Sequence, residues 1–293
     1  MTAQAGFVTP YRRRAGAVWA VGRRVDRMAE IVATSQDGTA VGALDEGSGP
    51  TLLVVHPGGG DASGWDAVAR GLTDDFRVVR LRRRVYLPGA DTAPGHSMAT
   101  EADDVLAVAE ALGGPILLVG HSSGAVAGLE AALRTPSAFV GMLAYEPPMP
   151  TSSPVGGAAV ALARKALDDG DPAEALRIHF RDVVRMSPTI TDALLRDPDM
   201  RQVLCVYAAA QIADDEAIDA LGVGADRFAA LDIPVTLVEG ALSPDHLKRR
   251  VADLAAVLPA AETVILPGQG HVAHLTAPAM LVEAIRTTAA KVL

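Results

Sequence analysis

Short apolar runs alternate with longer amphipathic segments along most of the chain. The apolar runs are bounded by glycine, proline and polar residues, a pattern typical of buried β-strands. It predicts strands at Met28–Ser35, Thr39–Asp45, Thr51–His56, Arg77–Arg82, Ile116–Gly120, Val140–Tyr145, Val235–Glu239 and Thr263–Leu266, the first two as a hairpin. Amphipathic patterns predict helices at Trp65–Leu72, Ala99–Leu112, Ala125–Arg134, Asp245–Leu258 and Ala277–Val292. Alternating strands and helices indicate an α/β fold with a mainly parallel sheet and helices on both faces.

The alternation is interrupted between Pro147 and Asp232. This segment begins with several prolines and then carries helical patterns at Val155–Asp168, Pro172–Met186, Ile190–Leu195, Asp199–Ala213 and Asp215–Phe228. We therefore expect a basic N-terminal extension over residues 1–27, a core over 28–146 and 233–293, and a helical insertion over 147–232. The apolar faces of the insertion have no other obvious surface to cover, so we expect it to form a lid over the sheet.

The most informative motif is Gly120-His121-Ser122-Ser123-Gly124, which lies between a predicted strand and a predicted helix. A sharp turn there would hold Ser122 in strained backbone geometry with its hydroxyl projecting above the sheet. Only small residues two before and two after the serine let the helix pass that close to the strand. The motif therefore predicts a nucleophile at Ser122.

Two further glycine-rich segments follow strands. His56-Pro57-Gly58-Gly59-Gly60 comes after an early strand, and Pro267-Gly268-Gln269-Gly270-His271 after the last one. With the serine motif and the insertion, these segments resemble the α/β-hydrolase family from about Met28 to the C-terminus. The resemblance implies an eight-stranded type of sheet and a Ser-His-acid triad in which His271 is the base. Serine rather than aspartate at position 122 argues against the dehalogenase and epoxide-hydrolase branches.

A serine nucleophile also needs donors for the oxyanion that forms during acyl transfer. The residue after the nucleophile supplies one backbone N–H, so Ser123 is the first expected donor. The second should come from the early glycine-rich loop, where Pro57 has no N–H. Gly58 is the preferred donor there, and Gly59 is the second choice.

At the acid of the triad the chain departs from the family pattern. After the strand Val235–Glu239 the family commonly has an aspartate, whereas Ser243 stands near that position in this chain. Some branches take the acid from the strand after the nucleophile, and Glu146 closes that strand here. Glu146 is the favoured acid, Asp245 is a weaker alternative, and a site without a proper acid stays open.

Other polar residues receive weaker interpretations. Arg82–Arg84 replace the family's usual Arg-Gly-x-Gly turn, and we expect them to be solvated rather than to line the pocket. His121 and His274 are expected to pack, and His56 to fix the oxyanion loop. The remaining histidines outside the triad, His96, His179 and His246, carry no visible motif.

Composition limits the classes of molecule that the protein is expected to bind. The 293 residues carry a net charge of −9, which disfavours nucleic acids and anionic membranes. No apolar run approaches the length of a membrane span, and the arginine-rich start lacks the pattern of an export signal, so we expect a cytoplasmic protein. No metal or organic cofactor is expected, and a metal is disfavoured because the histidines lack metal-ligand spacing. The partner should be a small molecule, and the oligomeric state is not predicted.

Together these observations predict a serine hydrolase that cleaves an ester or related acyl bond of a small, fairly apolar substrate. The same site could instead run acyl transfer, cyclisation or a lyase step in a biosynthetic pathway. A non-catalytic receptor on the same fold is a third possibility, but a receptor has no need to keep both Ser122 and His271.

Overall fold

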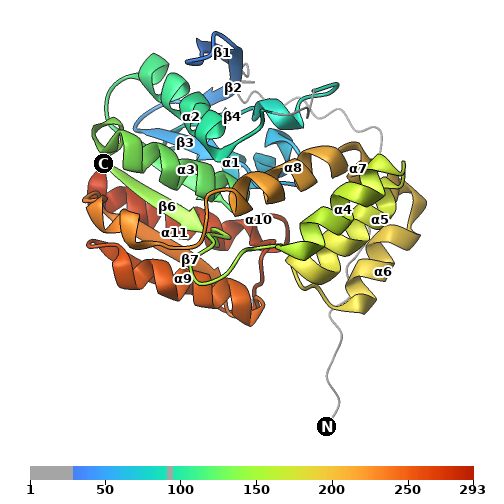
Figure 1. The fold of residues 1–293 in the computed structure, drawn as a ribbon. Helices are drawn as coiled ribbons and strands as arrows, with labels where there is room; N and C mark the ends of the chain where they lie inside the picture. The colour runs from blue at the N-terminus through green and yellow to red at the C-terminus, as the bar shows by residue number, and fades with distance from the viewer. Residues whose placement is uncertain (1–28, 91–94) are drawn as a thin grey trace, which may run out of the picture.

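The computed structural model describes residues 29–90 and 95–293, so the expected basic extension over 1–27 lies outside the described residues. Within those residues, eight strands form one sheet in the order β1-β2-β4-β3-β5-β6-β7-β8 (Figure 1). The strands are β1 (Ala29–Thr34), β2 (Ala40–Gly47), β3 (Thr51–Val55), β4 (Arg77–Leu81), β5 (Ile116–His121), β6 (Gly141–Tyr145), β7 (Val235–Gly240) and β8 (Ala261–Leu266). The predicted strands and the mainly parallel α/β fold are confirmed.

The sheet is parallel where the predicted chemistry lies. The hairpin β1–β2 and the pair β2–β4 are antiparallel, whereas all neighbours from β4 to β8 are parallel. Every residue of β5 and β6 is buried, as expected for central strands covered on both faces. The carboxyl ends of these strands therefore meet at one edge of the sheet.

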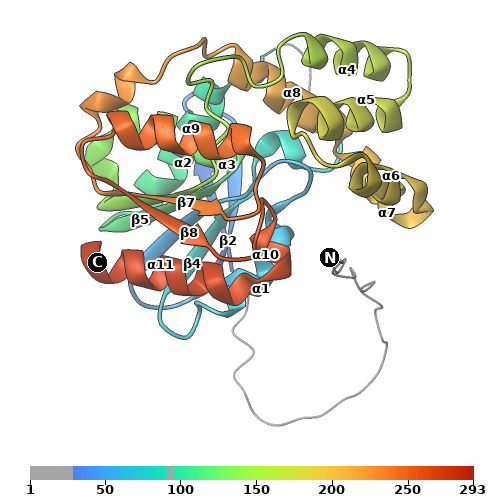
Figure 2. The same ribbon diagram turned by 90° about the horizontal axis from the view of Figure 1, so that it is seen from below.

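Helices cover both faces of the sheet. On one side lie α2 (Met98–Leu112), α3 (Ser123–Arg134) and α9 (Asp245–Val257), and on the other α1 (Asp66–Arg70), α10 (Ala273–Thr276) and α11 (Pro278–Val292) (Figure 2). The alternating side chains of β5 divide between the two apolar cores. Leu118 packs with the α2–α3–α9 layer, and Leu117 and Val119 pack with the α1–α11 layer.

Between β6 and β7 the chain forms α4 (Ala158–Asp168), α5 (Pro172–Ile178), α6 (Pro188–Arg196), α7 (Pro198–Val206) and α8 (Ala208–Asp219). Figure 1 shows α4–α7 standing beside the sheet, while α8 runs back towards it. The helical character of this segment was predicted correctly, but three boundaries were wrong.

The predicted helix Pro172–Met186 leaves α-helical geometry after Ile178 and continues as a π-helical turn over His179–Val183. The pattern at Asp199–Ala213 is broken at Tyr207, where α7 ends and α8 begins. The predicted helix Asp215–Phe228 is helical only over its first residues, which belong to α8 and end at Asp219, because the chain then turns through Gly222 and Gly224, both with positive φ. Amphipathic spacing located the buried faces but not the breaks between helices.

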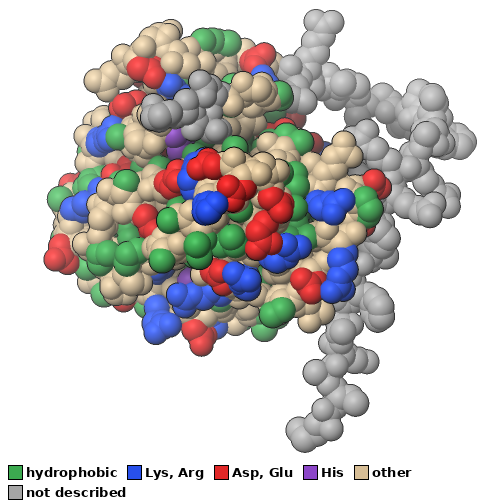
Figure 3. Space-filling view, turned by 45° about the vertical axis from the view of Figure 1, so that its right-hand side comes forward, with side chains coloured by type: hydrophobic (Ala, Val, Ile, Leu, Met, Phe, Trp, Pro, Cys, Tyr) green, Lys and Arg blue, Asp and Glu red, His purple; other side chains and the backbone are tan. Residues whose placement is uncertain are grey.

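Acidic and basic side chains are interspersed on the face seen in Figure 3, without a large patch of one sign. Among the residues that the structure describes, no helix is both long enough and apolar enough to span a membrane.

Candidate active site

Ser122 lies at the junction of β5 and α3 in a strained conformation, with φ 52° and ψ −126°. The neighbouring glycines explain how the turn fits. A Cβ on Gly120 would lie 2.5 Å from the Cα of Ala125, and a Cβ on Gly124 would lie 2.3 Å from the backbone oxygen of His56. The motif therefore forms the sharp strand-to-helix turn that its sequence predicted.

Ser122, His271 and Glu146 come together at the carboxyl edge of the sheet. His271 Nε2 lies 3.0 Å from Ser122 Oγ, and His271 Nδ1 lies 2.5 Å from Glu146 Oε2. The hydrogen bond from Ser122 N to Tyr145 O, 2.9 Å long, extends the β5–β6 pairing and sets Ser122 beside the end of β6. One imidazole therefore bridges the hydroxyl and the carboxylate.

The carboxylate of Glu146 is fully buried and firmly held. Its backbone has a positive φ of 44°, and the backbone N–H of Gly240 donates to Oε1 at 2.6 Å. Burial alone would raise the pKa of this carboxyl group, but hydrogen bonding and attraction to His271, with the Gly240 N–H, lower it below its usual range. Glu146 is therefore ionised in the folded protein at neutral pH.

The alternative acid does not approach His271. Asp245 has 90% of its side chain exposed and pairs with Lys248 on the same helix. Ser243 is buried beside the histidine loop, with its Oγ 3.9 Å from the place of a Cβ on Gly270. Of the two carboxylates weighed from the sequence, only Glu146 is brought to the imidazole.

The segments that carry the expected oxyanion donors touch each other. Ser123 is the first residue of α3, so its N–H has no acceptor within the helix. The loop from His56 to Gly60 lies against this first turn, as the close approach of Gly124 to the His56 oxygen shows. Gly58 is also closely packed, since a Cβ there would lie 2.3 Å from Gln211 Oε1 and 2.6 Å from Tyr86 Oη.

Two residues that the sequence did not single out as functional hold the loop of His271. His121 Nε2 donates to the backbone oxygen of His271 at 2.9 Å, and its ring stacks on Tyr145 at 4.4 Å between centroids. The hydroxyl of Tyr145 donates to the backbone oxygen of Gly270 and accepts from the N–H of Ala273 at 3.2 Å. Burial lowers the pKa of His121 well below its ordinary value, so this ring is a neutral anchor rather than a base.

The expectation that Arg82–Arg84 are solvated is wrong for Arg83. This side chain is fully buried and forms ion pairs with Glu101 of α2 and Asp214 of α8. Its guanidinium also donates to Ser123 Oγ at 2.8 Å and to the His56 oxygen at 3.3 Å. A buried guanidinium needs such partners, and the partners lie in parts of the chain that no local pattern connects.

Among the described residues, one group of side chains has the spacing of a metal site: His96, Glu101 and Asp214. Both carboxylates already pair with Arg83, whose fixed positive charge opposes a cation at the same place. His96 Nε2 donates to Asp214 Oδ1 at 2.8 Å. The group is therefore an ion-pair network rather than a set of free ligands.

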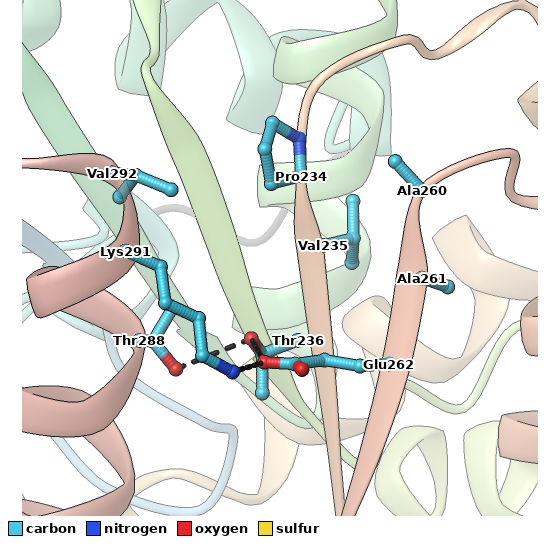
Figure 4. Close-up of a pocket in the computed structure, with 9 residues that line it drawn as sticks. All are labelled: Pro234, Val235, Thr236, Ala260, Ala261, Glu262, Thr288, Lys291 and Val292. Carbon is cyan, nitrogen blue, oxygen red and sulfur yellow. Dashed lines mark hydrogen bonds and ion pairs between the residues drawn. The ribbon is translucent and has the colours of Figure 1, made fainter.

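A pocket lies at the start of β7 and β8 (Figure 4). It is lined by the first residues of β7 and β8 and by the end of α11, with Lys291 and Glu262 paired across it. These are the amino ends of parallel strands, whereas Ser122 and His271 stand at the carboxyl ends. In open α/β sheets ligands bind at the carboxyl ends, so this pocket is not the candidate active site.

Comparison with known proteins agrees with the fold of the chain. A profile of the alpha/beta hydrolase family matches residues 52–284. The chain is 38% identical over 104 residues to the uncharacterized hydrolase YraK of Bacillus subtilis, which covers 34% of this chain and 38% of that relative. It is 36% identical over 99 residues to the pimeloyl-[acyl-carrier protein] methyl ester esterase of Methylococcus capsulatus, covering 33% and 36% of the two chains. These alignments thus span little more than a third of each curated relative.

A solved alpha/beta hydrolase from Sphaerobacter thermophilus superposes over much more of the chain. The TM-score is 0.76 and the identity 26%, with 87% of this chain and 100% of that chain covered. The profile match spans most of the sheet and both glycine-rich loops, from β3 to α11. This protein therefore belongs to the alpha/beta hydrolase family.

Proposed function

We propose that this protein is a serine hydrolase that cleaves an ester or related acyl bond of a small, fairly apolar substrate. The observation that carries the proposal is the continuous chain of hydrogen-bonding distances from Ser122 Oγ through His271 to the buried carboxylate of Glu146. A serine hydroxyl is inert at neutral pH without such a base. The esterase named among the relatives supports an ester as the substrate class.

In the proposed reaction, Ser122 Oγ attacks the acyl carbon while its proton passes to His271 Nε2. The oxyanion accepts hydrogen bonds from the backbone N–H groups of Ser123 and Gly58. Glu146 stabilises the imidazolium, which then returns the proton to the leaving alcohol as the acyl–oxygen bond breaks. Water, deprotonated by His271, hydrolyses the acyl-enzyme and regenerates Ser122.

We further propose that the chain divides as its sequence indicates, with residues 28–146 and 233–293 forming the hydrolase core and 147–232 a cap over the site. Support comes from Tyr207, at the break between α7 and α8, and from Gln211 on α8. The Tyr207 hydroxyl donates to Asp61 beside the oxyanion loop, and Gln211 packs on Gly58. The cap would thus select substrates by the size of the acyl group.

The test is covalent labelling with a fluorophosphonate, combined with turnover of p-nitrophenyl esters of increasing acyl length. Wild type should be labelled, and Ser122→Ala should lose both labelling and turnover. Ser137→Ala, at an exposed serine away from the site, is the matched control and should match wild type. If wild type is labelled and transfers acyl groups to alcohols but not to water, the activity is acyl transfer and not hydrolysis. Equal labelling of Ser122→Ala would refute the covalent mechanism.

A further inference from the structure

The buried side chain of Arg83 touches both segments from which the proposed oxyanion donors come. One terminal nitrogen donates to Ser123 Oγ at 2.8 Å and to the backbone oxygen of His56 at 3.3 Å. His56 is two residues before Gly58, and Ser123 carries the other proposed donor. A single rigid fork of N–H groups therefore links the two halves of the proposed oxyanion hole.

The other side of the guanidinium is held by the insertion. The second terminal nitrogen of Arg83 lies 2.8 Å from both carboxylate oxygens of Asp214, on α8. Asp214 also accepts hydrogen bonds from the Tyr86 hydroxyl and from His96 Nε2, each at 2.8 Å. Nε of Arg83 donates to Glu101 of α2 at 2.7 Å, so the planar group has little freedom to rotate.

Burial makes this arrangement sensitive to each partner. The side chains of Arg83 and Asp214 are both 0% exposed, and that of Glu101 is 1% exposed. Water cannot replace a lost partner there, so the guanidinium must move towards its remaining acceptors. Such a movement would pull on Ser123 and His56, because they are bonded to the same nitrogen.

We propose that Arg83 is a positioning residue for the oxyanion hole and that Asp214 of the insertion sets its position. The inference rests on the proposed function, since it concerns the same reaction. It makes the insertion a part of the catalytic geometry in addition to a cover over the substrate. Correct docking of α8 onto the core would then be required for a fast chemical step, even with small substrates that never touch the insertion.

The experiment compares Asp214→Asn with Glu216→Gln in the full-length protein, using p-nitrophenyl acetate. Glu216 lies on the same helix and pairs with Arg164 of α4 on the surface, so its variant is the matched control for loss of an α8 ion pair. We expect Asp214→Asn to lower kcat by about 10- to 100-fold with KM nearly unchanged, as for a small misplacement of catalytic groups. Glu216→Gln should behave as wild type.

The next measurement separates a positioning role of Arg83 and Asp214 from a role in stability alone. A boronic acid that forms a tetrahedral adduct with Ser122 needs the oxyanion hole, whereas a competing alcohol product does not. Asp214→Asn should weaken the binding of the boronic acid by the same factor by which it lowers kcat, and it should leave the binding of the alcohol unchanged. Equal weakening of both ligands, or wild-type kcat in the folded variant, would overturn the proposal.

Loss of Asp214 leaves a buried cation with fewer partners, so Asp214→Asn could fail to fold. Arg83→Lys is the second variant, because it keeps a charge near Asp214 but one ammonium group cannot reach acceptors on all four residues. It should show the same selective loss in kcat. Hydrogen exchange at residues 56–60 should rise in both variants but not in Glu216→Gln, and an unchanged exchange rate would refute the coupling. This readout needs no activity, so it still distinguishes this inference if wild type proves not to be a hydrolase.

Discussion

Replacing Glu146 by glutamine removes the negative charge next to His271 and leaves the volume of the side chain almost unchanged. Glu146 is fully buried, and its Oε2 lies 2.5 Å from His271 Nδ1. With charge centres about 4 Å apart and an effective dielectric constant of about 20, the lost attraction to an imidazolium is about 4 kcal/mol. This term acts when His271 becomes charged, so it appears in the barrier and corresponds to a loss of about 10³-fold in kcat.

The assay is turnover of a short p-nitrophenyl ester by Glu146→Gln, with Asp245→Asn as the control. Asp245 is exposed and does not approach His271, so its variant should stay within about 2-fold of wild type, as for most surface substitutions. KM should change little, because the charge that is lost interacts with the transition state and not with the bound ester. A folded Glu146→Gln enzyme with turnover within tenfold of wild type would refute the assignment of Glu146 as the acid. Severe loss in Asp245→Asn would contradict the geometry.

Three further predictions concern the turn around Ser122, the buried side chain of His274 and the insertion. Gly124→Ala would bring a Cβ within 2.4 Å of two backbone oxygens, so we expect a loss of ~1–3 kcal/mol in thermal unfolding experiments, whereas Gly64→Ala has open space and should not cause it. Burial and repulsion from His271 lower the pKa of His274 to about 4, so the unfolded chain binds more protons below pH 6.5. The unfolding free energy should fall from pH 6.5 towards pH 4. Denaturant titrations at several pH values should show that the unfolding free energy of His274→Gln changes less steeply with pH than that of wild type, by up to ~1.4 kcal/mol per pH unit. An unchanged slope would show that His274 does not titrate in this way. In a folded variant with a short linker in place of residues 147–232, relative turnover should depend less on acyl length, and an unaltered length preference would argue against a cap.

The sequence predicted the parts of the molecule that depend on local patterns. The strand–turn–helix around Ser122 and the loop before His271 each lie within a few residues, so their geometry follows from short-range sterics. Glu146 was predicted because a charged residue at the end of an apolar strand needs a partner, and the structure brings it to His271. The roles of His271 and Glu146 came from the resemblance to the α/β-hydrolase family, to which the strand order and elementary electrostatics added support.

The Arg83 network could not be predicted in the same way. Arg83 and Asp214 are separated by 131 positions, and neither lies in a motif. A run of arginines is usually solvated, and only the packing of α8 onto the core shows that one of them is buried. The helix boundaries of the insertion were missed for a related reason, since the pattern of buried faces is the same on both sides of a break such as Tyr207.

The position of Glu146 directly after β6 changes what the loop after β7 must provide. In the proposed triad that loop supplies no acid to the reaction. The last residue of β7, Gly240, donates its N–H to the carboxylate, and it cannot bear a Cβ because the Gln269 oxygen would lie 2.5 Å away. The next two residues hold the end of β8 and the histidine loop through their backbone. Ala241 N–H donates to the Leu266 oxygen at 3.0 Å and Leu242 N–H donates to the Gln269 oxygen at 2.7 Å, while the side chain of Leu242 is 72% exposed. The side chain at position 242 can therefore be exchanged by design near the catalytic edge, whereas an insertion there would break the hydrogen bonds that hold the loop of His271.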